Sequence, residues 1–120
     1  MKIFIKINIL IYLFLIAFMQ NLYAQEKIKI GLLVPLSGKN SQIGKSIVKS
    51  VRLAINKIDN SSIKIYPKDT ASSPEITLQN AKKLYEQGIK IIIGPVYNKN
   101  LVYLDELQEI IFLSLTNKVI

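Results

Sequence analysis

The 120-residue sequence contains no cysteine, no histidine and no tryptophan. Without cysteine the chain has no disulfide, no thiolate nucleophile and no site for a lipobox-type lipid anchor. Without histidine it lacks the commonest general base at neutral pH and the commonest zinc ligand. These absences argue against an enzyme, and we expect neither a cofactor nor a bound metal.

The charges are also one-sided, with 16 basic residues against 8 acidic ones and a formal net charge of +8. A nucleic-acid or anionic-membrane partner would be one explanation. However, Arg52 is the sole arginine, and no basic cluster has aromatic residues among it. Because bidentate recognition of bases and phosphates prefers arginine, we interpret the lysines as scattered over solvated faces and expect no nucleic-acid partner.

Residues 1–24 have the pattern of a secretory signal peptide. Two lysines precede an apolar core, Ile9–Met19, of the expected length of about 7–15 residues. Cleavage after Ala24 would leave residues 25–120 as the exported protein. The core is shorter than a typical spanning helix of about 20 residues. An uncleaved membrane anchor that begins near Ile3 is the alternative.

The segment from Lys27 to Gly44 determines the expected fold class. Its apolar run Ile28–Val34 is closed by a turn, Pro35–Gly38, and a helical pattern follows. A continuous apolar run of this kind is typical of a parallel strand that is covered on both faces. In such sheets, ligands bind at the carboxyl ends of the strands, beside helix amino termini.

Strand and helix patterns alternate along the rest of the chain. The expected elements are a strand over 28–34, a helix capped by Asn40 or Ser41 and ending near 58, a strand over 63–66, a helix over 74–87, a strand over 89–93, a helix over 98–109 and a strand over 110–115. In the second helix, the expected core residues are Ile76, Ala81, Leu84 and Tyr85. This βαβαβαβ order predicts an α/β fold, a doubly wound parallel sheet with right-handed crossovers.

The last expected strand would leave an open edge if the strand order is 2-1-3-4. Its residues 110–115 are mostly large and apolar. A long apolar edge promotes aggregation unless another strand covers it. We therefore expect residues 25–120 to be the amino-terminal part of a larger, here incomplete, domain.

The loops that follow the four strands would share one rim of the sheet. The candidate ligand-binding residues there are Ser37, Gly38, Asp69, Tyr97, Asn98, Thr116 and Asn117. Asp69 is the sole carboxylate at a strand end, and an aspartate in such a turn more often braces the loop. No base is present to activate a hydroxyl, and neither a dinucleotide-binding glycine pattern nor a Walker A motif occurs. This neutral set suits reversible binding of a small polar or zwitterionic ligand, although each residue could instead serve locally as a cap or packing group.

Four segments, in order, carry a family resemblance: IKIGLLVPLSG, IYPKDTASSPE, GIKIIIGPVYN and FLSLTN. From Lys27 to the end, the chain resembles the amino-terminal lobe of type 1 periplasmic binding proteins, the leucine-binding-protein-like superfamily. The DT with a following proline, the GP and the LTN resemble the penicillin-binding-protein activator branch in particular. The resemblance implies a two-lobed, non-enzymatic, periplasmic protein with a ligand cleft between its lobes.

The resemblance leaves two functions open. Amino-acid binders of the family hold the ligand's charged ends with small hydroxyl residues, at positions that correspond to 96–98 and 116–117 here. Val96 and Tyr97 depart from that pattern, and the absence of cysteine departs from the lipoprotein activators. The first hypothesis is a solute-binding component that delivers an amino acid or similar ligand to an ABC permease. The second is a regulator of peptidoglycan synthesis that contacts a penicillin-binding protein. A DNA-binding regulator is disfavoured because a signal peptide stands where a helix-turn-helix would lie.

Overall fold

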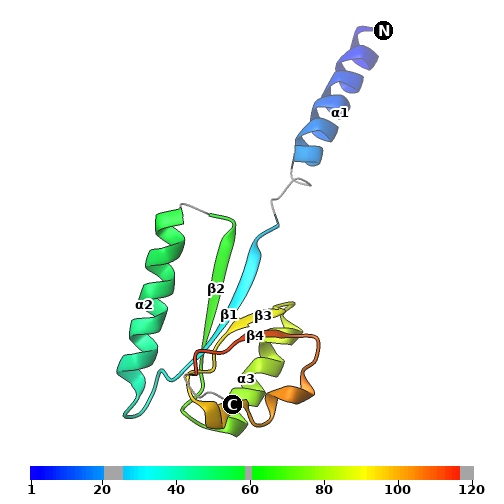
Figure 1. Cartoon of the computed structure of the whole chain (residues 1–120). Helices are drawn as coiled ribbons and strands as arrows, with labels where there is room; N and C mark the ends of the chain where they lie inside the picture. Colours follow the sequence, from blue (N-terminus) through cyan, green and yellow to red (C-terminus); the bar gives the residue numbers. More distant parts are fainter. Residues whose placement is uncertain (21–25, 59–60, 117–120) are drawn as a thin grey trace.

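The computed structural model describes residues 1–20, 26–58 and 61–116. The elements, in order, are α1 (Lys2–Gln20), β1 (Ile28–Val34), α2 (Ser41–Ile58), β2 (Ile63–Asp69), α3 (Pro74–Glu86), β3 (Ile91–Ile93), the 3-10 helices η2 (Asn98–Leu101) and η3 (Leu104–Glu106), and β4 (Ile111–Leu113). The strands form one parallel sheet in the order β2-β1-β3-β4 (Figure 1). The expected fold class is therefore confirmed, and the strand order is the 2-1-3-4 order that was considered from the sequence.

The amino-terminal helix α1 extends away from the sheet and has no buried residue (Figure 1). Among the described helices it is the one long and apolar enough to cross a membrane, a property that signal sequences share. Its 19 residues extend for about 28 Å, close to the roughly 30 Å of a bilayer core. Helix length therefore does not separate a signal peptide from a membrane anchor, contrary to the sequence-based argument. The expected cleavage site at Ala24 lies outside the described residues.

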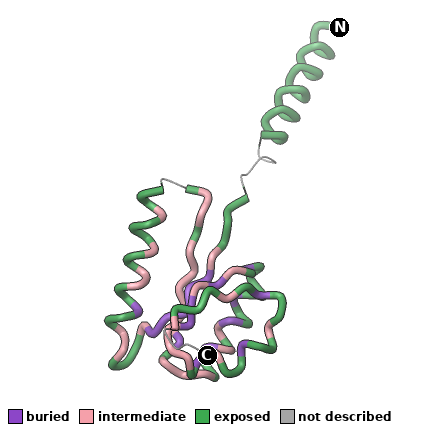
Figure 2. The backbone as a smooth tube through the Cα atoms, viewed as in Figure 1, coloured by how far each residue is buried: buried purple, intermediate pink, exposed green. Residues whose placement is uncertain are grey.

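Strand β1 is the centre of the sheet. It pairs with β2 along its whole length, from Ile28 opposite Ile63 to Val34 opposite Asp69. Its other edge pairs with β3 over Ile30–Leu32. The last three residues of β1 are completely buried, whereas its first residue is exposed (Figure 2). β1 is therefore covered on both faces mainly toward its carboxyl end, where the predicted rim begins.

The main hydrophobic core lies between the sheet and α3. Leu33 and Ile92 from the strands pack there with Ala81 and Leu84 of α3, as expected for those two helix positions. The prediction that Ile76 and Tyr85 of α3 are core residues was wrong, because they are 38% and 37% exposed. A helix that buries positions 77, 81 and 84 turns positions 76 and 85 away by about 100° each.

Residues 98–109 do not form the expected α-helix. Two short 3-10 helices, η2 and η3, occupy this region instead. Its apolar residues Leu101, Leu104 and Leu107 lie three positions apart, which matches the 3-10 period of three residues per turn. All three still contact the core, with Leu104 buried. The type of element was therefore wrong, although its three leucines face the core.

The strand bounds differ most from expectation at the edges of the sheet. β2 continues to Asp69, while β3 and β4 contain three residues each. β4 has β3 as its neighbour and is the open edge that the sequence predicted. Its residues Ile111 and Leu113 are 61% and 53% exposed. The face of the sheet opposite α3 is thus only partly covered, because α2 packs over β1 and β2.

Helix α2 approaches the turn after β1 so closely that position 44 requires glycine. A Cβ atom added to Gly44 would lie 1.7 Å from the carbonyl oxygen of Pro35. Gly44 is also the one buried residue that α2 contributes. The contact between this glycine and the β1–α2 turn therefore fixes where α2 begins relative to the sheet.

We expect Gly44→Ala to destabilise the protein. In a helix interior, alanine is more favourable than glycine by about 1 kcal/mol. However, a clash with a backbone carbonyl cannot be relieved by rotating a side chain. Overpacking typically costs about 1–3 kcal/mol, so the clash should prevail. Urea unfolding of the full chain, followed by circular dichroism, measures the effect. Gln42→Ala, at an exposed position of the same helix, is the matched control; equal stability of the two variants would contradict the close approach.

Candidate functional site

The carboxyl ends of the parallel strands bring four loops to one end of the sheet, residues 35–40, 70–73, 94–97 and 114–116. We call these loops, with the first turn of η2, the rim. Of the predicted ligand residues, Ser37 and Gly38 are exposed there, and Asp69, Tyr97, Asn98 and Thr116 are half-buried. Asn117 lies outside the described residues. The predicted residues therefore do lie at the same end of the molecule.

Hydrogen bonds tie the rim loops together in pairs. On one side, the amide of Asn40 donates to the hydroxyl of Ser72 at 3.2 Å, joining the loops after β1 and β2. On the other side, the N–H of Leu115 donates to the carbonyl of Pro95 at 3.1 Å, joining the loops after β3 and β4. The rim thus has a β1–β2 half and a β3–β4 half, each held together by its own contacts.

The carboxylate of Asp69 braces the β1–β2 half. Its Oδ1 accepts the N–H of Leu36 at 2.7 Å and the N–H of Ala71 at 2.8 Å. Burial raises the pKa of this carboxyl, but hydrogen bonds from Ser37, Leu36 and Ala71 outweigh burial, and the net pKa lies below its usual value. Asp69 is therefore ionised at neutral pH and already engaged within the protein, and its contact with a ligand stays a prediction.

The turn after β2 has an unusual backbone. Ala71 and Ser72 both have positive φ, 48° and 54°, although neither is glycine. Such left-handed residues cost about 1–2 kcal/mol each, so they persist where surrounding bonds hold them. Asp69 provides one such bond, and the amide of Asn80 donates to the Asp69 carbonyl at 2.6 Å. Neither Asn80 nor the strained turn was predicted, because nothing in the local sequence distinguishes them.

The amino-terminal end of α3 is capped by a side-chain hydroxyl. The hydroxyl of Ser73 accepts the N–H of Ile76 at 3.4 Å, and Pro74 begins the helix.

The β3–β4 half contains a buried polar residue that was not predicted from the sequence. Asn100, in η2, is 1% exposed, and its side-chain amide has no hydrogen-bond partner among the described residues. A buried amide without a partner is costly, by about 1–3 kcal/mol.

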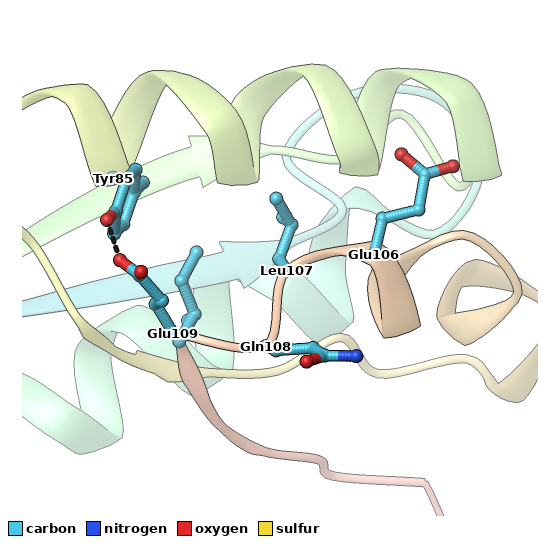
Figure 3. A pocket seen from close by; sticks show the side chains of 6 residues that line it. Tyr85, Glu106, Leu107, Gln108 and Glu109 are labelled. Atoms are coloured by element: carbon cyan, nitrogen blue, oxygen red, sulfur yellow. Dashed lines mark hydrogen bonds between the residues drawn. The ribbon is translucent and has the colours of Figure 1, made fainter.

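The cavity drawn in Figure 3 lies away from the rim. It measures about 420 Å³ and is formed by Tyr85 and residues 106–110. The Tyr85 hydroxyl donates to the Glu109 carboxylate, and that bond and charge raise the pKa of Tyr85 (Figure 3). Glu106 pairs with Lys82 at 3.6 Å. The acidic side chains of this cavity are thus partly engaged in contacts within the protein. In residues 1–20, 26–58 and 61–116, no three acidic side chains lie close enough together to hold a metal ion.

Comparison with protein families gives a match along most of the chain. A family model described as periplasmic binding protein matches residues 27–116. An uncharacterized protein of Methanocaldococcus jannaschii, MJ1266, is 34% identical over 80 residues, which cover 60% of this chain and 19% of the relative. The chain therefore spans about a fifth of that relative's length.

Solved structures of similar fold fall into two groups. The C-domain of LpoA from Haemophilus influenzae, described as a regulator of PBP1A, is 29% identical, with a TM-score of 0.57 over 72% of this chain and 27% of that one. A solute binding protein of an ABC transporter from Rhodopseudomonas palustris, in complex with 3,4-dihydroxy benzoic acid, is 26% identical, with a TM-score of 0.64 over 69% and 24%. LivJ from Streptococcus pneumoniae, in complex with isoleucine, is 19% identical, with a TM-score of 0.67 over 77% and 30%, which shows the fold alone.

We expect Asp69→Asn to destabilise the protein at pH 7 by about 1–2 kcal/mol, because the neutral amide accepts backbone hydrogen bonds more weakly than the carboxylate. The pKa of Asp69 is lowered in the folded protein from its ordinary value of 3.8. Its ionised form therefore stabilises the fold above that pH, and the contribution is lost as the pH falls through the folded pKa.

The measurement is urea unfolding of both proteins between pH 7 and pH 3. The stability difference between wild type and Asp69→Asn should shrink as the pH falls below about 4. Asp105→Asn, which changes an exposed carboxylate, is the control and should have little effect at any pH. A difference that does not depend on pH would contradict the bracing role of the charge.

Proposed function

Because the chain belongs to the periplasmic binding protein family, we propose that it is a non-enzymatic solute-binding component whose rim forms one wall of a site for a small polar ligand. The ligand is an amino acid or a similar carboxylate, delivered to an ABC permease. The observation that carries the proposal is the rim itself, where neutral hydroxyl and amide groups from separate loops lie beside a single ionised carboxylate.

The two halves of the rim suit the two ends of a zwitterion. In the β1–β2 half, the ionised Asp69 would attract an ammonium group, with Ser37 beside it as a hydroxyl partner. In the β3–β4 half, the side chains of Tyr97, Asn98 and Thr116 offer neutral donors for a carboxylate. The ligand named for the Rhodopseudomonas palustris structure, 3,4-dihydroxy benzoic acid, carries a carboxylate. This likeness supports a carboxylate ligand here.

We further propose that residues 25–120 are the amino-terminal part of a larger domain, exported to the periplasm by residues 1–24. The exposed β4 edge and the partly covered sheet face support this, since apolar surface of this kind is normally covered. The matching solute-binding structures are three to four times longer than the part that this chain covers. A second lobe would then close over the rim and enclose the ligand.

The uptake proposal predicts that a ligand raises the melting temperature of the protein. The full chain, together with any sequence that follows Ile120 in the gene, is heated with each of the twenty amino acids and with benzoate. At a hundred times Kd, binding to the native state adds about 2.7 kcal/mol of stability. Thr116→Val, which removes one rim hydroxyl, should reduce the shift; Ser46→Ala, at an exposed position of α2, should not. No shift with any compound would contradict the proposal.

A second candidate function is a regulator of peptidoglycan synthesis that acts by protein contact. The observation in its favour is the 29% identity with the LpoA C-domain, a regulator of PBP1A, over 72% of the chain. The half-buried Val96 and Tyr97, which replace small hydroxyl residues of amino-acid binders, agree with it. Such a protein would need no tight small ligand at the rim.

The regulator hypothesis predicts capture of a penicillin-binding protein. The immobilised full chain is incubated with solubilised membranes whose penicillin-binding proteins carry a fluorescent penicillin, and the retained bands are read on a gel. A retained band that excess soluble protein displaces would support the regulator. Absence of any band, together with a thermal shift by an amino acid, would exclude it as the main function.

A further inference from the structure

A groove that meets the rim at Leu36 runs along the outer edge of the sheet, between α2 and β2. Two adjoining cavities of about 400 and 320 Å³ share Arg52 and Asn56. The first cavity extends to Leu36 and Pro67 near the rim, and the second extends to Ile63 at the start of β2. In Figure 1, α2 and β2 lie beside each other at the left edge of the domain. We call this feature the α2–β2 groove.

One wall of the groove is basic. Lys45, Lys49 and Arg52 line it, and their spacing of four and three residues puts them on one side of α2. α2 contains no aspartate or glutamate, and these three side chains form no ion pair within the described ranges. Lys82 and Glu106, which do form one, lie on the α3 side of the sheet. The charges on this wall are thus available to a partner.

The rest of the groove is apolar. Its apolar lining consists of Leu36, Val48, Leu53, Ile55, Ile63, Ile65 and Pro67. Leu53 is exposed, although it is a large apolar side chain. A concave surface that combines exposed apolar groups with unpaired positive charge is typical of a docking site for another molecule.

Charge is distributed unevenly between the two halves of the exported chain. Residues 27–74 contain nine basic residues and two aspartates. Of the two, Asp69 is engaged by backbone N–H groups, and Asp59 lies outside the described residues. Residues 75–116 contain five acidic and four basic residues, which are nearly balanced. The positive charge is therefore concentrated on the part of the chain that forms α2 and β2, and a partner there should be acidic.

The other wall is an open strand edge. β2 is at one end of the sheet and has β1 as its neighbour, so the outward backbone groups of Ile63 and Ile65 have no strand partner in the described chain. Nearer the rim, Pro67 has no N–H, and the Asp69 carbonyl accepts the amide of Asn80. Such an edge can pair with an extended segment of another protein. Side chains of an extended segment recur on one side about every 6.6 Å, and Lys45 and Lys49 lie about 6 Å apart along the helix axis. Carboxylates at alternate positions would therefore fit the basic wall.

We propose that the α2–β2 groove binds an extended acidic segment of a partner protein, which adds to the edge of β2 and places alternate carboxylates against Lys45, Lys49 and Arg52. A bilayer surface fits less well because it is flat, whereas this site is concave with an apolar lining. A nucleic acid fits less well because no aromatic side chain lines the groove for base stacking. The inference does not depend on the rim or on its ligand.

The test uses a fluorescein-labelled peptide, Val-Glu-Val-Glu-Val-Glu-Val, and fluorescence anisotropy with the full chain in a non-ionic detergent. We expect saturable binding that weakens as salt rises. Lys49→Gln combined with Arg52→Gln should weaken it by about tenfold, since two exposed charge pairs of ordinary strength are lost. Lys83→Gln combined with Lys99→Gln removes the same charge from exposed positions outside the groove and should change binding by less than about twofold. Melting temperatures confirm that both variants are folded.

Three outcomes would overturn the proposal. An equal loss in both double variants would show attraction to net charge alone. If a peptide that is N-methylated at alternate residues binds as tightly as the unmethylated peptide, pairing with β2 is excluded. If the groove variant binds the peptide normally but binds vesicles of anionic phospholipid less well than the control variant does, the occupant is a membrane surface. A loss confined to the groove variant and to the N-methylated peptide would establish the groove as the docking site.

Discussion

The carboxyl half of β1 is buried from both faces of the sheet, and the positions of the other elements depend on this constraint. Leu33 packs into the core under α3, while its neighbours Leu32 and Val34 point to the face on which α2 lies. Both covering helices must therefore approach the same short stretch of strand. Close approach is possible because Gly44 lets α2 reach the carbonyl of Pro35, and Gly94 lets the end of β3 reach the carbonyl of Leu33. The rim is built directly on these contacts, which is why its loops lie together.

The ionised Asp69 connects this packing to the proposed ligand site. Its carboxylate accepts N–H groups from the loops after β1 and β2, so the charge that gives the rim its electrostatic character also holds the loops in place. A ligand's ammonium group would meet a charge that is already oriented, at little cost in reorganisation. The strained turn at Ala71 and Ser72 is tolerated for the same reason, because the brace stabilises a backbone that would otherwise relax. Binding of the proposed ligand and stability of the rim would therefore be coupled through one side chain.

Local signals were sufficient for the elements that determine the topology. The long apolar run of β1 and the helical pattern that follows it each act within a few residues, so the alternation of strands and helices, and the parallel sheet that it implies, could be predicted. The region after β3 could not be predicted as well, because its leucine spacing fits both helix types and tertiary contacts decide between them. The bond from Ala71 to Asp69 spans two residues and agrees with the expected role of an aspartate in a turn. The bond from the N–H of Leu36 to Asp69, and the burial of Asn100, depend on residues distant in the sequence. Local patterns contain no information about either.

The two flanks of α2 explain why its helical pattern was easy to recognise from the sequence, whereas the roles of its apolar and basic side chains were not. Ile43, Ile47 and Ile58 lie on the flank turned away from the groove, and two of them are exposed. Because the groove follows the β2 edge, this apolar flank faces the side of β3 and β4, where the sheet itself is also uncovered. Lys45, Lys49 and Arg52 form the opposite flank. An apolar stripe and a basic face are normally read as core and solvent. Here the described chain neither buries the apolar flank nor pairs the charges of the basic flank. We therefore expect apolar residues to cover the first flank and an acidic partner to bind the second.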